Sequence, residues 1–122
     1  MEIFTSEILE RLAANGAATR AAQMEGREEP DHVPVIKVFN PYGPATWLLT
    51  ESDPDRPDLL FGLCDLGHGT PKLGNVLRSE IEELRIEISG SALPLERDRR
   101  FTSTEPLSVH TREAQAARRI VA

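Results

Sequence analysis

The chain has 122 residues, a length that suits one domain with one hydrophobic core. Hydrophobic residues make up 39% of the chain and aromatic residues 5%, which supports a modest core and argues against a deep built-in substrate cavity. The formal net charge of −6 argues against direct binding of duplex DNA, because duplex-binding surfaces need clustered basic residues.

Composition also bears on the cellular setting. No apolar run approaches the roughly 20 residues needed to cross a bilayer, and the first residues show no basic segment followed by an apolar core. Cys64 is the only cysteine, so no intramolecular disulfide can form. We therefore expect a cytoplasmic protein that does not associate with membranes.

The first part of the chain is predicted to be helical. Four apolar residues recur there at helical spacing: Phe4, Ile8, Leu9 and Leu12. Thr5 or Ser6 can cap the first turn. Asn15-Gly16 is expected to end this helix, and the Ala-rich residues 17–24 to form a second one. Residues 26–34 are charged and contain proline, which predicts a loop.

The centre of the chain is predicted to be β-rich. Four strands are expected, at residues 35–39, 45–50, 59–66 and 73–77. The connections between them carry turn-forming residues, at 40–43, 51–58 and 67–71. Because parallel neighbours need long crossovers, these short connections favour an antiparallel meander. Trp47 and Leu49 fall on one face of the second strand and Leu48 on the other.

A short helix is predicted to follow the fourth strand. Ser79 and Glu82 have the spacing of a capping box, with Ser79 as the N-cap of a helix that runs to Leu84. Residues 85–88 alternate like a strand but also continue the helical spacing before them. The pattern leaves both helix and strand open for this segment.

The last part of the chain mixes extended and helical patterns. Residues 93–95 and Phe101 predict edge-strand or extended packing, and Pro106 suits the first turn of a final helix. The expected fold class is therefore α+β, with an antiparallel four- to five-stranded meander sheet, N-terminal helices and a C-terminal helix packed on it. We expect a single domain, 1–122, with an N-terminal helical region (1–25), a central β-meander (33–78) and a mixed C-terminal region (79–122).

Three segments carry a resemblance to a known family. They read DHVPVIKVFNPYGPATWLLTE, LLFGLCDLGHGTPKLGNV and LPLERDRRFTSTEPLS. Through them the chain resembles the bacterial domain of unknown function DUF2958 from about Phe4 to Ala116. The resemblance implies a small cytoplasmic protein or module of plasmids, conjugative elements and other mobile DNA. It implies no activity and supplies no catalytic residues. Residues 85–92 are longer here than the family's usual link.

Three side chains near the end of the third predicted strand could do chemistry. A Cys64–His68 pair could form a thiolate nucleophile, and an Asp65–His68 pair could orient a general base. However, neighbours in a strand point to opposite faces, so we expect Cys64 to be buried and inert. Turn formation explains Asp65 and His68 as well, because Asp side chains accept hydrogen bonds from turn backbone.

Asp31 and His32 in the loop after the N-terminal helices supply a second His–Asp pair. If this loop meets the turn after the third strand, Asp31, His32, Asp65 and His68 could hold a metal ion or a small ligand. In that case His32, Asp65 and His68 are the candidate catalytic residues. A small enzyme or metal/ligand-binding domain is therefore the alternative hypothesis, and it requires these four side chains to converge.

Other patterns favour structural roles. A run of acids offers oxygen ligands but lacks the turn glycine and distal glutamate of an EF-hand: Glu51, Asp53, Asp55 and Asp58. Three glycines fit neither the Rossmann fingerprint nor a P-loop: Gly67, Gly69 and Gly74. We predict no cofactor. Two arginine groups leave a small polyanion contact open beside the simpler reading of solvated faces: Arg97, Arg99 and Arg100, then Arg112, Arg118 and Arg119.

The sequence thus favours an acidic protein-interaction or accessory module of mobile elements, with another protein as its partner. An anti-defence role is one version of this hypothesis. In a sharper version, the acids of 51–58 and 80–87 imitate DNA phosphates. Oligomeric state is left open by the sequence.

Overall fold

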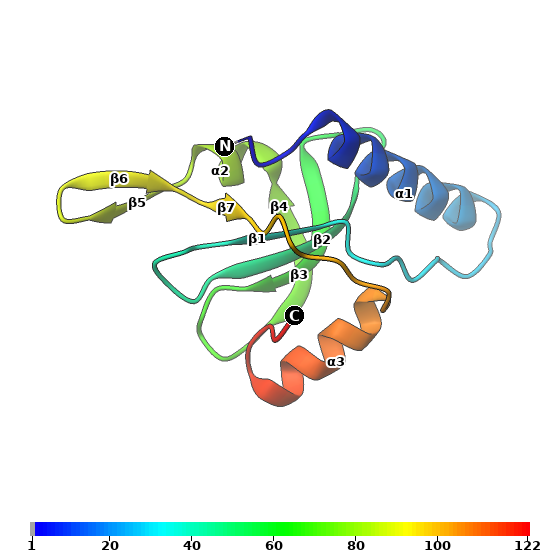
Figure 1. The fold of residues 1–122 in the computed structure, drawn as a ribbon. Helices are drawn as coiled ribbons and strands as arrows, with labels where there is room; N and C mark the ends of the chain where they lie inside the picture. Colours follow the sequence, from blue (N-terminus) through cyan, green and yellow to red (C-terminus); the bar gives the residue numbers. More distant parts are fainter. Residues whose placement is uncertain (1) are drawn as a thin grey trace.

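The computed structural model describes residues 2–122 and shows an α+β fold (Figure 1). The helices are α1 (Ser6–Met24), α2 (Arg78–Glu83) and α3 (Leu107–Ala117). The strands are β1 (Ile36–Phe39), β2 (Thr46–Ser52), β3 (Leu59–Asp65), β4 (Lys72–Leu77), β5 (Arg85–Ile88), β6 (Ser91–Pro94) and β7 (Glu96–Arg97). The predicted fold class and the four central strands are confirmed.

The main sheet has the strand order β4-β3-β2-β1-β7, and its neighbours run antiparallel. β1 to β4 form the predicted meander, and β7 returns from the C-terminal half to pair with β1. β2 is irregular between Leu49 and Glu51, where the register with β3 shifts. Such a bulge changes the face to which the following side chains point. It places Glu51 opposite Phe61.

Helices cover both faces of this sheet (Figure 1). One core cluster joins α1 and α2 to one face and contains Leu12, Ile36, Trp47, Leu49 and Ile81. The other cluster joins α3 to the opposite face and contains Leu48, Leu63, Leu107, Ala114 and Ile120. Trp47 and Leu49 therefore point away from Leu48, as the alternation of the strand predicts.

α1 is one continuous helix, so the prediction of two N-terminal helices was wrong. It begins after Thr5, whose hydroxyl accepts a hydrogen bond from the backbone N–H of Ile8 at 3.2 Å. Asn15 and Gly16, which looked like a stop signal, form the contact with the sheet. The Asn15 side chain donates to the Thr50 carbonyl at 2.9 Å. A Cβ added at Gly16 would lie 1.8 Å from the Ser52 carbonyl oxygen, so only glycine permits this approach.

α2 also begins differently from the prediction, which made Ser79 its N-cap. The helix starts at Arg78, and the Glu80 carboxylate accepts from the Leu77 N–H at 3.3 Å. Ser79 instead donates its N–H and its hydroxyl to Asp58, at 3.0 and 2.7 Å. The loop before β3 therefore supplies the carboxylate that caps this helix.

Residues 85–88, left open between helix and strand, form β5. β5 pairs with β6 through a two-residue turn in which Ser89 and Gly90 have φ values of 50° and 83°. Two successive positive φ values are typical of the type I′ turn, whose twist suits a hairpin. The hairpin projects from the body of the molecule (Figure 1). We call residues 84–94 the hairpin arm.

Within residues 2–122, no helix combines the length and the apolar character needed to span a bilayer.

Candidate functional site

Asp65 is a buried anchor for the C-terminal segment. Its side chain is only 2% exposed, and each carboxylate oxygen accepts a backbone hydrogen bond. Gly67 N–H donates to Oδ1 and Ile120 N–H to Oδ2, both at 2.9 Å. The first contact is the turn predicted from the sequence, and the second ties the chain after α3 to the end of β3.

Asp31 and His32 hold the other end of α3. The Asp31 carboxylate accepts from the backbone N–H of Ser108 at 3.1 Å and also from the Ser108 hydroxyl. The His32 carbonyl oxygen accepts from the Leu107 N–H at 2.8 Å. Together they satisfy N–H groups of the first turn, and the Asp31 charge lies at the positive end of the helix dipole.

The four predicted site residues do not converge. Asp31 contacts the start of α3 and Asp65 the segment after its end, and an 11-residue helix separates these points by about 16 Å at 1.5 Å per residue. His68 is exposed on the turn between β3 and β4. Within residues 2–122, no group of three or more His, Cys, Asp or Glu side chains could hold a metal ion.

Cys64 lies on the opposite face from Asp65, as alternation along β3 predicts. Its side chain is half-buried and packs against the core cluster of α1, while Asp65 contacts Ile120 on the α3 side. Burial raises the pKa of the Cys64 thiol. The thiol form is therefore favoured, and a thiolate nucleophile is not.

Two acids of the loop between β2 and β3 stabilise that loop. Asp53 Oδ1 accepts from the backbone N–H of Asp55 at 2.8 Å and of Arg56 at 3.1 Å. Arg20 on α1 forms ion pairs with Asp53 at 3.6 Å and with Asp55 at 2.7 Å. These contacts attach the loop to α1, which accounts for two of the four acids without any bound cation.

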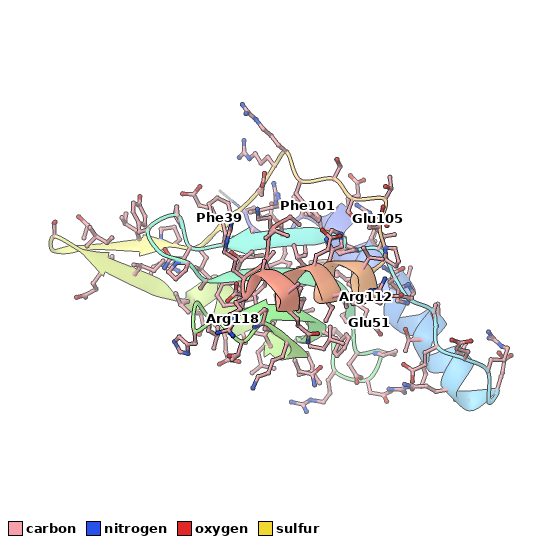
Figure 2. The ribbon with its side chains drawn as sticks, turned by 90° about the horizontal axis from the view of Figure 1, so that it is seen from below. Phe39, Glu51, Phe101, Glu105, Arg112 and Arg118 are labelled. Atoms are coloured by element: carbon pink, nitrogen blue, oxygen red, sulfur yellow. The ribbon has the colours of Figure 1, made fainter. Side chains whose placement is uncertain are left out.

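Glu51 is different, because it lines a groove between α1, the loop before β1 and the sheet. One part of the groove has a volume of about 240 Å³ and the adjoining part about 140 Å³. Glu29, Glu51 and Phe61 line both parts. Thr19 on α1 also lines it, and its hydroxyl lies 3.0 Å from Nε2 of His32. Glu51 lies at the end of the sheet away from the hairpin arm (Figure 2).

The electrostatic setting of Glu51 also stands out. Desolvation by burial raises the pKa of the Glu51 carboxyl, and the negative charge of Glu29 raises it further. A hydrogen bond from Thr19 and the charge of His32 act in the opposite direction and lower this pKa. Thr19 and His32 therefore offset only part of the effect of burial, and the pKa of this half-buried carboxyl stays raised.

The sequence did not single out this arrangement. Thr19, His32 and Glu51 come from three separate elements, and the bulge in β2 turns Glu51 out of the expected alternation. A second hydroxyl–imidazole pair, Ser103 and His110 at 2.7 Å, was also missed. Ser103 additionally accepts from the Glu105 N–H at 3.1 Å, so this pair orders the turn before α3.

The opposite end of the sheet is apolar and protruding. The turn between β1 and β2, the turn between β3 and β4 and the hairpin arm all point to the same side of the molecule (Figure 1). Each carries an exposed large apolar side chain. Tyr42 is 52% exposed, Leu66 is 58%, and on the arm Leu84 is 41% and Ile88 37%. Exposed apolar side chains on protruding turns can take part in an interaction surface.

These features define a small α+β protein whose five-stranded antiparallel sheet has a polar groove at one end and protruding hairpins at the other. The family model described as "Protein of unknown function (DUF2958)" matches residues 3–121, nearly the whole chain. The chain belongs to this family. No curated protein and no solved structure matched the chain.

Proposed function

We propose that the protein is a cytoplasmic protein-interaction module that binds its partner through the hairpin arm. The observation that supports this proposal is that the arm forms a sheet of its own. β5 and β6 pair only with each other, in a sheet separate from the main one. A two-stranded hairpin is marginally stable in water by itself, so a partner that covers the arm would stabilise it.

The arm offers a partner one apolar face. Ile86, Ile88 and Leu93 share this face because Ile86 is opposite Leu93 in the register of the two strands. Ile86 packs partly against the core at the base of the arm, whereas Ile88, near the tip, is 37% exposed. The apolar face therefore continues from the core into solvent, where it can enter a groove on another protein.

Charge narrows the class of partner. The segment formed by α2 and the arm carries four acids, Glu80, Glu82, Glu83 and Glu87, against two basic residues, Arg78 and Arg85. A partner with an apolar groove and a basic rim complements this surface. The resemblance to proteins of mobile DNA extends the proposal to a host-defence or element-maintenance protein as the partner.

The alternative hypothesis of a small enzyme using Asp31, His32, Asp65 and His68 has less support. Asp31 and Asp65 accept backbone hydrogen bonds at opposite ends of α3, and each of these contacts explains the residue by folding. The interaction hypothesis needs no such convergence and uses surface that the fold leaves uncovered.

Affinity capture from the native host with the Ile88→Glu variant tests the proposal. We expect the variant to lose the partner that the wild-type protein retains, because a charge would enter the apolar face of the arm. The matched control is Met24→Glu, which changes an 80% exposed apolar residue at the end of α1. The control should retain the partner, and Ile88→Glu should stay within about 0.5 kcal/mol of wild-type stability. Equal recovery by both variants, or no specific partner at native expression, would contradict the proposal.

A further inference from the structure

The groove at the other end of the sheet holds the half-buried carboxylate of Glu51, beside a second acid and the ring of His32. In the part of the chain that the structure describes, Glu51 forms no ion pair. Arg20, a cation that lines the same groove, is held by Asp53 and Asp55. A partly desolvated carboxylate beside a second acid, Glu29, is costly unless a positive charge approaches it. We propose that this groove binds an organic cation, an alkylammonium or alkylguanidinium group, with Glu51 as its counter-ion.

The walls of the groove suit a cation that carries an alkyl chain. Leu59 and Phe61 supply apolar surface, and an aromatic face attracts a nearby ammonium or guanidinium group. Gln23 and Asn75 supply amide groups that can accept hydrogen bonds from such a head group. The larger part, about 240 Å³, has room for a short alkyl cation.

Two neighbouring side chains favour the charged form of Glu51 that binding of a cation requires. The Thr19 hydroxyl and the His32 ring favour the charged form of the carboxylate, while their mutual distance of 3.0 Å fixes them against each other. The contacts join α1, the loop before β1 and β2, so the counter-ion is held by three elements of the fold. A site positioned in this way needs little reorganisation to bind.

Titration with n-butylguanidinium, followed by backbone amide NMR, tests the inference. We expect chemical-shift changes at residues that line the groove, and no such changes with the neutral isostere n-butylurea. Glu51→Gln keeps the size of the side chain and should weaken binding about tenfold, because it removes a charge-assisted contact. The matched control is Glu28→Gln, which makes the same change in charge at a residue of the loop before β1 that does not line the groove. It should bind like the wild-type protein.

The outcomes separate the inference from its competitors. Equal binding of n-butylurea and n-butylguanidinium, undiminished binding by Glu51→Gln, or no saturable shift with n-butylguanidinium would overturn it. A Gly-Arg-Gly peptide with blocked ends distinguishes the source of the cation: binding at least as tight as that of n-butylguanidinium indicates a protein side chain, and weaker binding a small molecule. Partner capture through the arm is independent of this site, so Glu51→Gln should leave it unchanged.

Discussion

The two ends of the sheet are built in different ways. At the groove end, α1, the loop before β1, the loop before β3 and the start of α3 are joined by side-chain contacts to distant backbone. Asn15 binds Thr50, Asp31 binds Ser108, and Asp58 binds Ser79. At the hairpin end, the arm is stabilised mainly by its own strand pairing and turn. One end is specified by tertiary contacts and the other by local structure.

This difference has a functional consequence. Regions with few contacts to the rest of a protein open at low free-energy cost, and binding surfaces that adapt to partners are often found there. The groove end, in contrast, holds polar groups in fixed positions, which suits recognition of a small charged ligand. The two proposals therefore assign partner binding to the end with few tertiary contacts and ligand binding to the end with many.

The largest expected effect tests whether the groove end depends on close packing. Gly16→Ala places a methyl group against the Ser52 carbonyl, at a position 1.8 Å from its oxygen before relaxation. We expect a loss of about 3 kcal/mol or more in the free energy of unfolding, measured by urea denaturation, because α1 must move off the sheet.

Gly74→Ala is the matched control for this substitution. Gly74 lies on the edge strand β4, and a Cβ there meets nothing within 4 Å. The control should change stability by less than about 1 kcal/mol. Similar losses for the two variants would show that α1 is not seated on the sheet through Gly16.

A smaller effect tests the cap that the loop before β1 places on α3. Asp31→Ala removes the acceptor for Ser108 and should lower the free energy of unfolding by about 1 kcal/mol, the usual cost of losing a helix cap. Glu28→Ala, a few residues earlier in the same loop, should have little effect. If Asp31→Ala were as stable as wild type, the contact between Asp31 and Ser108 would not stabilise the groove end.

The smallest effect is the pH dependence that Glu51 contributes. Because the pKa of Glu51 is raised in the folded protein, the folded state holds this proton more tightly than the unfolded state. The contribution of Glu51 to the free energy of unfolding therefore decreases as pH rises from the ordinary glutamate pKa through the raised value. Glu51→Gln removes this loss, so its stability advantage over wild type should grow between about pH 4 and pH 7.

Denaturation of both proteins across this pH range checks the sign. Glu29, His32, Asp53 and Arg20 also face the groove, but they are shared by both proteins. The difference between the two curves therefore isolates Glu51. An advantage that shrinks as pH rises would contradict the raised pKa and the desolvated setting on which it depends.

Local patterns in the sequence predicted the meander because its turns are short and its strands are rich in apolar and β-branched residues. They also predicted the turn at Asp65. The prediction that Asn15-Gly16 ends the first helix was wrong, because packing of Gly16 against Ser52 outweighs the local turn signal. Residues 85–88 stayed open until the positive φ values at Ser89-Gly90 showed the hairpin, although Ser-Gly is itself a turn-forming pair.

The candidate site was much less predictable than the fold. Thr19 and His32 are separated by 13 residues, and Glu51 joins them only because a bulge changes the face to which it points. Neither the bulge nor the approach of the loop to α1 has a signal in a single sequence. The predicted acids and histidines were chosen for their chemistry, but the fold sets their positions. Asp31 contacts the start of α3 and Asp65 contacts the segment after its end, so the two acids lie far apart.

The most direct test of the central claim places a photo-crosslinking amino acid at position 88 of the full chain and irradiates the native host. If the hairpin arm is the docking surface, position 88 should give one discrete crosslinked product, and the same probe at position 24 should give none. A product of equal yield from both positions, or no product from position 88 while the native partner is present, would contradict the account.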